Sequence, residues 1–144
     1  MIKIKFYVTF FFLISSSFLS QANAQGLSHS DTTRANQTVQ QQREACARAP
    51  VKAAYSYDSP SIKKIFQSYS DFEVMIKNSY QAVYRPKSVD FGVVQSVETG
   101  VVLKLYLVDP DGAFVTAEYE LKKQDNNLWL ISSCILIKNA SEQI

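Results

Sequence analysis

The chain has 144 residues, of which 47% are hydrophobic, 12% aromatic and 19% charged. This composition excludes collagen, a coiled coil and a wholly disordered chain, and the length favours one domain. Lys3 and Lys5 account for the formal net charge of +2, so the rest of the chain is close to neutral. A neutral balance argues against a nucleic-acid-binding protein and against a polybasic protein of the membrane surface.

The first 24 residues have the pattern of a secretory signal peptide. Lys3 and Lys5 precede an apolar stretch over residues 6–19, and small residues at 22–24 form a cleavage site. Three serines at 15–17 interrupt the apolar run, which is shorter than the roughly 20 apolar residues of a membrane span. We therefore predict cleavage after residue 24, export to the periplasm or the extracellular space, and no membrane attachment afterwards.

Residues 25–34 are small and polar and predict a flexible leader, so that the folded domain extends over residues 35–140. His29, the only histidine of the chain, lies in this leader. A side chain on a mobile segment is poorly placed for acid–base catalysis, because such catalysis requires fixed geometry.

Helical patterns fill the first half of the domain. Residues 36–49 favour a helix, which Pro50 ends, and a second short helix follows over residues 51–55. Ser59 and Pro60 then have the preferences of a helix start. A further amphipathic helix is predicted from about residue 70, with the apolar residues Phe72, Met75 and Ile76 at helical spacing.

After Pro86 the apolar residues alternate, which predicts strands near 89–97, 101–108, 113–123 and 128–138, joined by short turns. One face of the first strand is expected to carry Val89, Phe91, Val93 and Val97. One face of the last strand is expected to carry Trp129, Ile131, Ser133, Ile135 and Ile137, and the opposite face Leu130, Ser132, Cys134 and Leu136. The predicted fold class is α+β, with amino-terminal helices packed on one face of a bent four-stranded antiparallel sheet.

Both faces of the last strand are apolar, so a partner subunit is expected to cover the sheet face that the helices leave free. This arrangement predicts a homodimer through the sheet face. No polar cluster or basic groove in the sequence suggests nucleic acid as a partner.

Cys46 and Cys134 both remain after signal cleavage. In an oxidising compartment they could form one disulfide, but they could equally be two buried thiols. We expect Cys46 on the first helix to lie near Cys134 on the last strand. Two cysteines without a nearby histidine make a zinc site improbable.

One cluster combines aromatic rings with hydrogen-bonding groups, which is typical of a ligand pocket. Its members are Tyr55, Tyr57, Asp58, Tyr80, Tyr84 and Arg85. The structural alternative is that the rings fill the core and Arg85 pairs with Asp58 or with a helix end.

A catalytic interpretation would use Asp58 as a base and Tyr55 or Tyr84 as a hydrogen-bond donor. The other acidic candidates are Asp90, Asp109, Glu118 and Glu120, which suit turns or a solvated strand face. The sequence has neither a nucleophile elbow nor a glycine-rich phosphate loop. We therefore expect no cofactor and no metal.

Two linked runs resemble a known family. They are residues 54–60 and 83–86, followed by Phe91 and by similar residues at 109–112, 119–120 and 129–131. The chain from 51 to 138 is similar to an uncharacterised family of bacterial proteins, domain of unknown function 4864. The resemblance implies a cone-shaped fold like that of nuclear transport factor 2, with a cavity between helices and sheet. It implies no reaction.

Residues 40–43, Gln-Gln-Gln-Arg, depart from this pattern, because they are more polar than the bulky first helix of such a fold. Our leading hypothesis is an exported, non-enzymatic module that binds an unidentified small molecule or protein. The alternatives are a small isomerase or dehydratase and a protein–protein dimerisation module.

Overall fold

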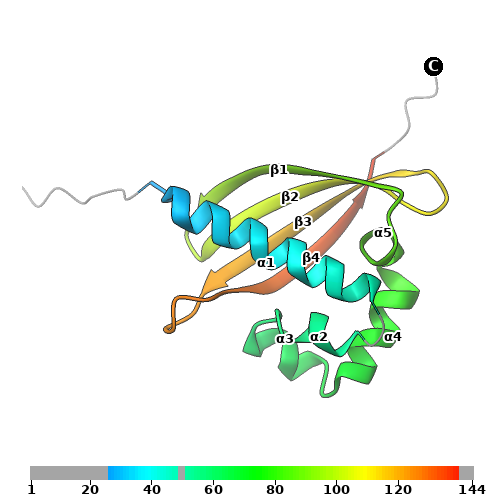
Figure 1. Ribbon diagram of the computed structural model, residues 1–144, viewed down its shortest axis with the longest axis horizontal. Coiled ribbons are helices and arrows are strands. Elements are labelled where there is room, and N and C mark those ends of the chain that lie inside the picture. Colours follow the sequence, from blue (N-terminus) through cyan, green and yellow to red (C-terminus); the bar gives the residue numbers. More distant parts are fainter. Residues whose placement is uncertain (1–25, 49–50, 140–144) are drawn as a thin grey trace, which may run out of the picture.

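The computed structural model describes residues 26–48 and 51–139. Figure 1 shows a long helix lying across a twisted sheet, with shorter helices gathered at one end. The predicted signal peptide and its cleavage site lie outside the described residues. Of the helices described, none is both long enough and apolar enough to cross a membrane.

Helix α1 (His29–Ala47) begins earlier than the sequence pattern predicted. The Ser28 side chain accepts a hydrogen bond of 3.0 Å from the Asp31 N–H and donates one of 2.9 Å to the Asp31 carboxylate. This cap starts the helix within the segment expected to be a flexible leader, so that boundary is wrong. The buried face of α1 carries Ala35, Val39, Gln42 and Cys46.

Four short helices follow: α2 (Lys52–Tyr55), α3 (Pro60–Ile65), α4 (Tyr69–Ser79) and α5 (Gln81–Tyr84). Pro60 occupies the first turn of α3, where its missing N–H costs no hydrogen bond. Ser68 caps α4 by accepting a hydrogen bond of 3.2 Å from the Asp71 N–H. The short helices α2, α3 and α4 were predicted from the sequence, whereas α5 was not.

The sheet is an antiparallel meander in the order β1-β2-β3-β4. Its strands are β1 (Ser88–Val97), β2 (Gly100–Val108), β3 (Phe114–Lys123) and β4 (Trp129–Lys138). The helices precede the sheet in the chain, and α1 packs on it (Figure 1). The α+β class with a four-stranded antiparallel sheet is therefore confirmed.

The core lies between α1 and one face of the sheet. Its sheet side consists mainly of alternate residues of β2 and β3: Val101, Leu103, Leu105, Leu107, Val115, Ala117, Tyr119 and Leu121. A second, smaller core joins Cys46 of α1 to the short helices through Val51, Ala54, Phe72 and Ile76. The two cores meet at Tyr80, which packs against both.

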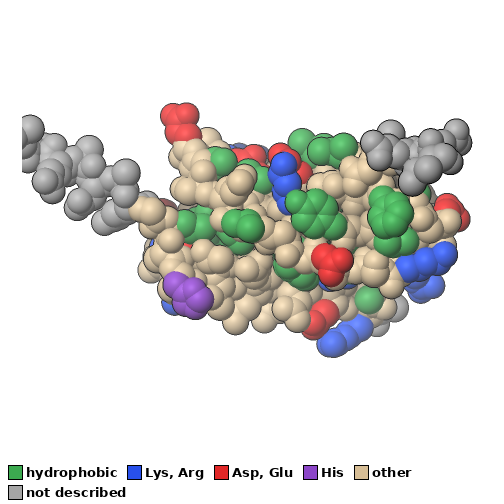
Figure 2. Space-filling model, turned by 90° about the horizontal axis from the view of Figure 1, so that it is seen from above, with side chains coloured by type: hydrophobic (Ala, Val, Ile, Leu, Met, Phe, Trp, Pro, Cys, Tyr) green, Lys and Arg blue, Asp and Glu red, His purple; other side chains and the backbone are tan. Residues whose placement is uncertain are grey.

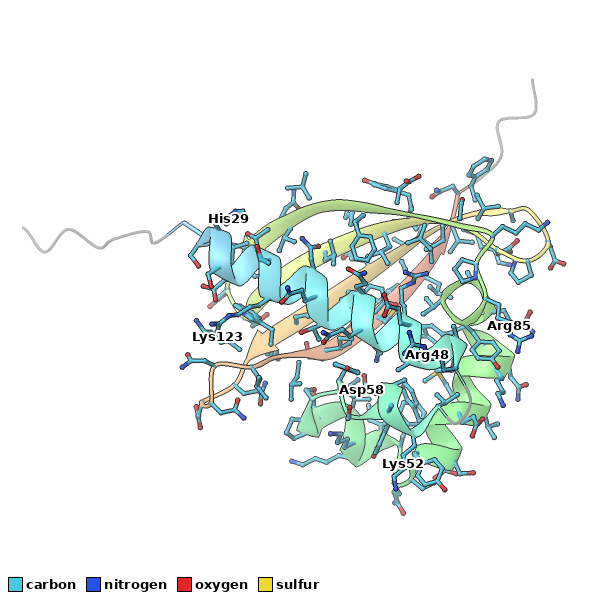
Figure 3. All side chains as sticks on the ribbon, viewed as in Figure 1. His29, Arg48, Lys52, Asp58, Arg85 and Lys123 are labelled. Carbon is cyan, nitrogen blue, oxygen red and sulfur yellow. The ribbon has the colours of Figure 1, made fainter. Side chains whose placement is uncertain are left out.

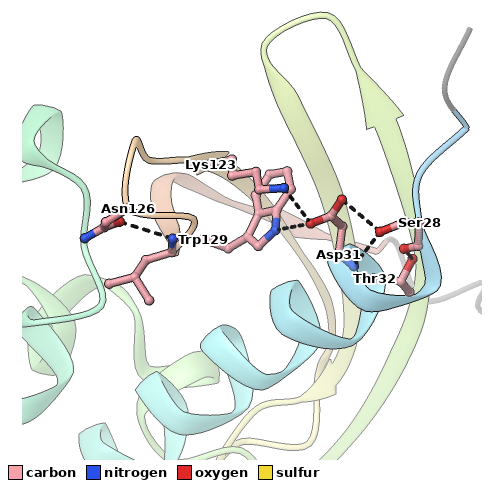
Figure 4. A network of polar contacts seen from close by, with 7 residues as sticks. Ser28, Asp31, Thr32, Lys123, Asn126 and Trp129 are labelled. Atoms are coloured by element: carbon pink, nitrogen blue, oxygen red, sulfur yellow. Dashed lines mark hydrogen bonds and ion pairs between the residues drawn. The ribbon is translucent and has the colours of Figure 1, made fainter. Parts of the chain in front are cut away.

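Trp129 is anchored at the amino-terminal end of α1 (Figure 4). Its indole N–H donates a hydrogen bond of 3.1 Å to the Asp31 carboxylate, and Lys123 lies at the same distance from the same oxygen. These bonds hold the pKa of Asp31 below its usual value, with the Trp129 bond as the largest cause. The β3–β4 hairpin is thus tied to the start of the first helix.

The predicted faces of β4 are wrong beyond Ile131, because the strand contains an extra residue. Leu121 pairs with Ile131 but Glu120 pairs with Ser133, which leaves Ser132 as a bulge. The Ser132 hydroxyl donates to the Glu120 carbonyl oxygen at 3.1 Å. After the bulge the pattern is inverted: Cys134 and Leu136 pack against the core, whereas Ile135 and Ile137 are exposed.

The predicted face of β1 is also wrong, because this strand contains a similar irregularity. The pairing with β2 shifts between Phe91 and Val94, so that Val89 and Val94 pack inward and Val93 is 78% exposed. Gly92 lies in this shift. A Cβ atom there would come within 2.8 Å of the Lys104 carbonyl oxygen, so glycine permits the close approach of β1 to β2.

The sheet face opposite α1 carries exposed apolar side chains. The register places Thr116 between Tyr106 and Ile137, and the exposed residues Phe114 and Ile135 lie on the same two strands as Thr116 and Ile137. Figure 2 looks at the molecule from the side of β1 and shows hydrophobic side chains in separate groups, with charged and polar atoms between them. Pairing of two chains through the sheet face stays a prediction.

Candidate ligand-binding cavity

A cavity of about 350 Å³ lies between the short helices and the β3–β4 side of the sheet. Most of its wall is apolar: Ile62, Ile65, Phe66, Phe72, Met75, Ile76, Val83 and Ile131. The polar part of the wall consists of Gln42, Asp58, Tyr80, Tyr119, Ser132, Ser133 and Cys134. Ile65 is 69% exposed, so the cavity opens to solvent beside α3.

Asp58 is held by backbone pairing with β4. The residues on either side of it form two hydrogen bonds to Ile131: the Ile131 N–H donates to the Tyr57 carbonyl at 2.9 Å, and the Ser59 N–H donates to the Ile131 carbonyl at 2.8 Å. This short parallel bridge joins the segment after α2 to the sheet. Figure 3 shows Asp58 between α1 and the short helices.

Asp58 is 2% exposed, and only one of its two carboxyl oxygens has a hydrogen-bond partner among the described residues. Gln42 Nε2 donates a hydrogen bond of 2.8 Å to Oδ1, whereas Oδ2 has no hydrogen-bond partner among the described residues. Burial raises the pKa of Asp58 to about 7, against the opposing effects of the Gln42 hydrogen bond and the Lys63 charge. A carboxyl group in this state can hold or release a proton near neutral pH.

Tyr119 provides the second unsatisfied group. Its side chain is 1% exposed, and within the described part of the chain its hydroxyl has no hydrogen-bond partner. Cys134 is directly opposite it in the β3–β4 ladder, and the nearby thiol contributes to the shift in the pKa of the Tyr119 hydroxyl. Burial raises the pKa of Tyr119 well above its usual value, so the hydroxyl is neutral and able to donate.

Tyr80 closes the wall between α4 and the sheet. Its hydroxyl donates a hydrogen bond of 2.9 Å to the Cys134 carbonyl oxygen. The ring is therefore fixed across the boundary of the two cores.

The structure brings together two of the six residues that the sequence grouped, Asp58 and Tyr80. The Tyr55 hydroxyl donates to the Phe66 carbonyl oxygen at 2.6 Å, and Tyr57 lines a separate surface groove beside Trp129. Tyr84 packs against the smaller core beneath Arg85, whose guanidinium carbon lies 5.0 Å from the ring centroid.

Arg85 itself points away from Asp58 at the far side of the short helices (Figure 3). The two do not form the ion pair that the structural alternative suggested. Neither Tyr55 nor Tyr84 lines the cavity. The structure therefore does not place either tyrosine beside Asp58 in the cavity, as the catalytic interpretation required.

Sequence reasoning missed Gln42 and Tyr119. Gln42 belongs to the polar run that departs from the expected first helix, and its amide is used to bind Asp58 inside the protein. That departure was the one signal available. Tyr119 has the same alternating pattern as its core neighbours, so nothing in the sequence marks its hydroxyl.

Of the two alternatives for the cysteines, the disulfide is absent, because both cysteines are free. Cys46 packs in the smaller core, whereas Cys134 packs against the main core beside Tyr119. Burial raises the pKa of each thiol to about 12, which makes both unreactive as thiolates.

The fold and the cavity define an α+β domain with a cavity of ligand size between the short helices and the sheet. Within residues 26–48 and 51–139, no three His, Cys, Asp or Glu side chains gather as a metal site would require. Comparison with known families matches residues 28–144 to "Domain of unknown function (DUF4864)". The chain belongs to this family. Searches of curated proteins and of solved structures found no match.

Proposed function

We propose that this protein is an exported module that binds a small, largely apolar molecule in the cavity between the helices and the sheet. The observation that carries the proposal is a pair of buried polar groups on the cavity wall, Asp58 Oδ2 and the Tyr119 hydroxyl. Neither has a hydrogen-bond partner among the described residues, and the other side chains of the wall are mainly apolar. Buried polar groups are nearly always hydrogen-bonded in folded proteins. A bound molecule would supply the missing partners.

The size of the cavity supports the same function. At about 350 Å³ it lies at the lower end of the range for small-molecule pockets, which begins at about 300 Å³. We also propose that the fold is a form of the nuclear transport factor 2 cone, as the resemblance of the bacterial family implies. The twisted sheet with one long helix across it supports this assignment.

Export rests on the pattern of residues 1–24. The basic start, apolar stretch and small-residue cleavage site support a periplasmic or extracellular protein. Sequencing the amino terminus of the protein recovered from its own compartment tests this, with Gln25 as the expected first residue.

The binding function is tested with N-phenyl-1-naphthylamine, a neutral apolar dye that becomes fluorescent in apolar surroundings. We expect one dye to bind per chain and expect Met75→Trp to abolish the binding, because Met75 lines the cavity. Val74→Trp is the matched control, since Val74 is the neighbouring residue of α4 and is 57% exposed. Equal dye binding by both variants, or no binding by the unmodified protein, would reject the proposal.

A second candidate function is proton transfer on a bound molecule, as in an isomerase or dehydratase. The pKa of about 7 at Asp58 favours it, because a base works best when its pKa is near the ambient pH. Tyr119 would take the donor role expected of Tyr55 or Tyr84. The test is solvent deuterium exchange at the α-carbon of cyclohexanone, followed by NMR, which should require Asp58 and stop in Asp58→Asn.

A further inference from the structure

We propose that the ligand of this cavity is a small organic amine, whose protonated amino group pairs with the Asp58 carboxylate while its apolar body occupies the rest of the space. This inference rests on the binding function proposed above and names the chemical class of the ligand.

The charge of the wall is the first argument. Among the described residues that line the cavity, Asp58 is the one carboxylic acid. No lysine, arginine or histidine belongs to this lining. A buried carboxylate repels anionic ligands and attracts cations strongly, because little water screens it. Carboxylates and phosphates are therefore poor candidates for this site.

The protein's own cations leave Asp58 free. Lys63 is the cation that lowers its pKa, but the Lys63 ammonium lies 5.4 Å from the centroid of the Tyr55 ring, outside the cavity. Arg43 is half-buried on α1, and its main electrostatic interactions are with Tyr119 and Cys46. Oδ2 of Asp58 is consequently a buried oxygen without a hydrogen-bond partner among the described residues, on a residue that lines the cavity.

The energetic cost of burying the carboxyl group falls on folding, not on binding. Gln42 fixes Oδ1 at 2.8 Å, so the carboxyl plane is oriented before a ligand arrives. An incoming ammonium group therefore loses its own hydration but meets a preorganised partner. Charge-assisted hydrogen bonds of this kind are stronger than those a neutral hydroxyl can form.

The remaining walls suit an ammonium group and an apolar body. Phe66 and Phe72 meet edge to face with ring centroids 5.9 Å apart, and Tyr80 adds a third ring. Aromatic faces attract organic cations. The Tyr119 oxygen can accept one N–H while its hydroxyl proton remains available to a second polar atom. The volume of about 350 Å³ equals that of about a dozen water molecules, which leaves room for a small aromatic amine.

The test compares three probes that share a 2-phenylethyl group: 2-phenylethylamine, 2-phenylethanol and 3-phenylpropanoate. Binding is measured by calorimetry at about pH 8, where Asp58 is largely ionised. We expect the amine to bind at least about tenfold more tightly than the alcohol, and the carboxylate not to bind. Asp58→Asn should reduce amine binding to the level of the alcohol and leave the alcohol unchanged. Asp90→Asn, an exposed position on β1, is the matched control.

Each outcome decides between the two proposals. If N-phenyl-1-naphthylamine and the alcohol bind but the amine binds no more tightly than the alcohol, the cavity binds ligands and the amine inference is overturned. If Asp58→Asn retains full amine affinity, the inference is overturned as well. If neither the dye nor any of the three probes binds, the proposed function itself fails. The comparison of amine with alcohol in the unmodified protein decides the question even if Asp58→Asn does not fold.

Discussion

The Gln42 side chain donates a hydrogen bond of 2.8 Å to the Asp58 carboxyl group. It joins the buried face of α1 to the segment that pairs with β4, and it satisfies one oxygen of a carboxyl that is 2% exposed. The other oxygen lacks a partner among the described residues. This arrangement gives Asp58 a measurable effect on stability.

Asp58 should make the protein less stable as the pH rises from about 4 to about 7. Because its pKa is raised from 3.8 to about 7, the folded state keeps a proton in this range that the unfolded state has lost. The contribution of Asp58 to the free energy of unfolding therefore falls across this window, by at most about 4 kcal/mol, and is constant above it. Urea unfolding of Asp58→Asn should lack this decline. Asp90→Asn should retain it, and parallel pH profiles for all three proteins would contradict the raised pKa.

Tyr119→Phe should leave the stability unchanged or raise it by up to about 1 kcal/mol, because it removes a buried hydroxyl without a hydrogen-bond partner. Tyr80→Phe is the contrasting variant. Its hydroxyl donates to the Cys134 carbonyl at 2.9 Å, so its loss should cost about 1 kcal/mol. Denaturant titrations measure both. A larger loss in Tyr119→Phe than in Tyr80→Phe would show that the Tyr119 hydroxyl is already satisfied.

Gly100→Ala should be far more destabilising than Gly112→Ala. At Gly100 a Cβ atom would lie 2.1 Å from the Leu121 carbonyl oxygen, at a φ of +153°. At Gly112 the φ is +89° but the nearest atom is the Lys87 ammonium at 3.8 Å, so the cost there is the backbone strain of about 1 to 2 kcal/mol. The midpoints of thermal unfolding give the ranking. Similar midpoints would mean that β2 and β3 can separate at this end.

Both cysteines should be free but unreactive in the folded protein. Burial raises the pKa of Cys46 and of Cys134 to about 12, so the thiolate is scarce at neutral pH. A chromogenic disulfide reagent should detect two thiols per chain after unfolding and react slowly before it. If the unfolded, non-reduced protein contained no thiol, Cys46 and Cys134 would form a disulfide and this prediction would be wrong.

Much of the fold was predictable because its signals are local. The alternating strands and Asp109-Pro110-Asp111-Gly112 predict the meander, and Pro60 predicts the start of α3. The faces of β4 were not predictable, because a single extra residue at Ser132 exchanges them. That bulge depends on the hydrogen bond from Ser132 to the Glu120 carbonyl, a contact between different strands.

The candidate site was predictable only in part. Asp58 lies in a run that resembles the family. The residues that contact a side chain from distant parts of the chain, however, cannot be identified from the amino-acid sequence alone. Tyr84 and Arg85 follow Tyr80 closely in sequence, yet they lie outside the cavity, while Tyr119 lines it from another strand. Clustering along the chain was therefore a poor guide to clustering in space.

The sequence by itself determined most of the order of helices and strands, because periodicity and turn chemistry act between neighbouring residues. The neutral charge balance follows from composition alone. Only the tertiary structure decided that Gln42, Asp58 and Tyr119 line one cavity and that the two cysteines pack in different clusters as free thiols. Those relationships depend on strand register and on how the helices pack on the sheet. Both are set by contacts between residues far apart in the chain.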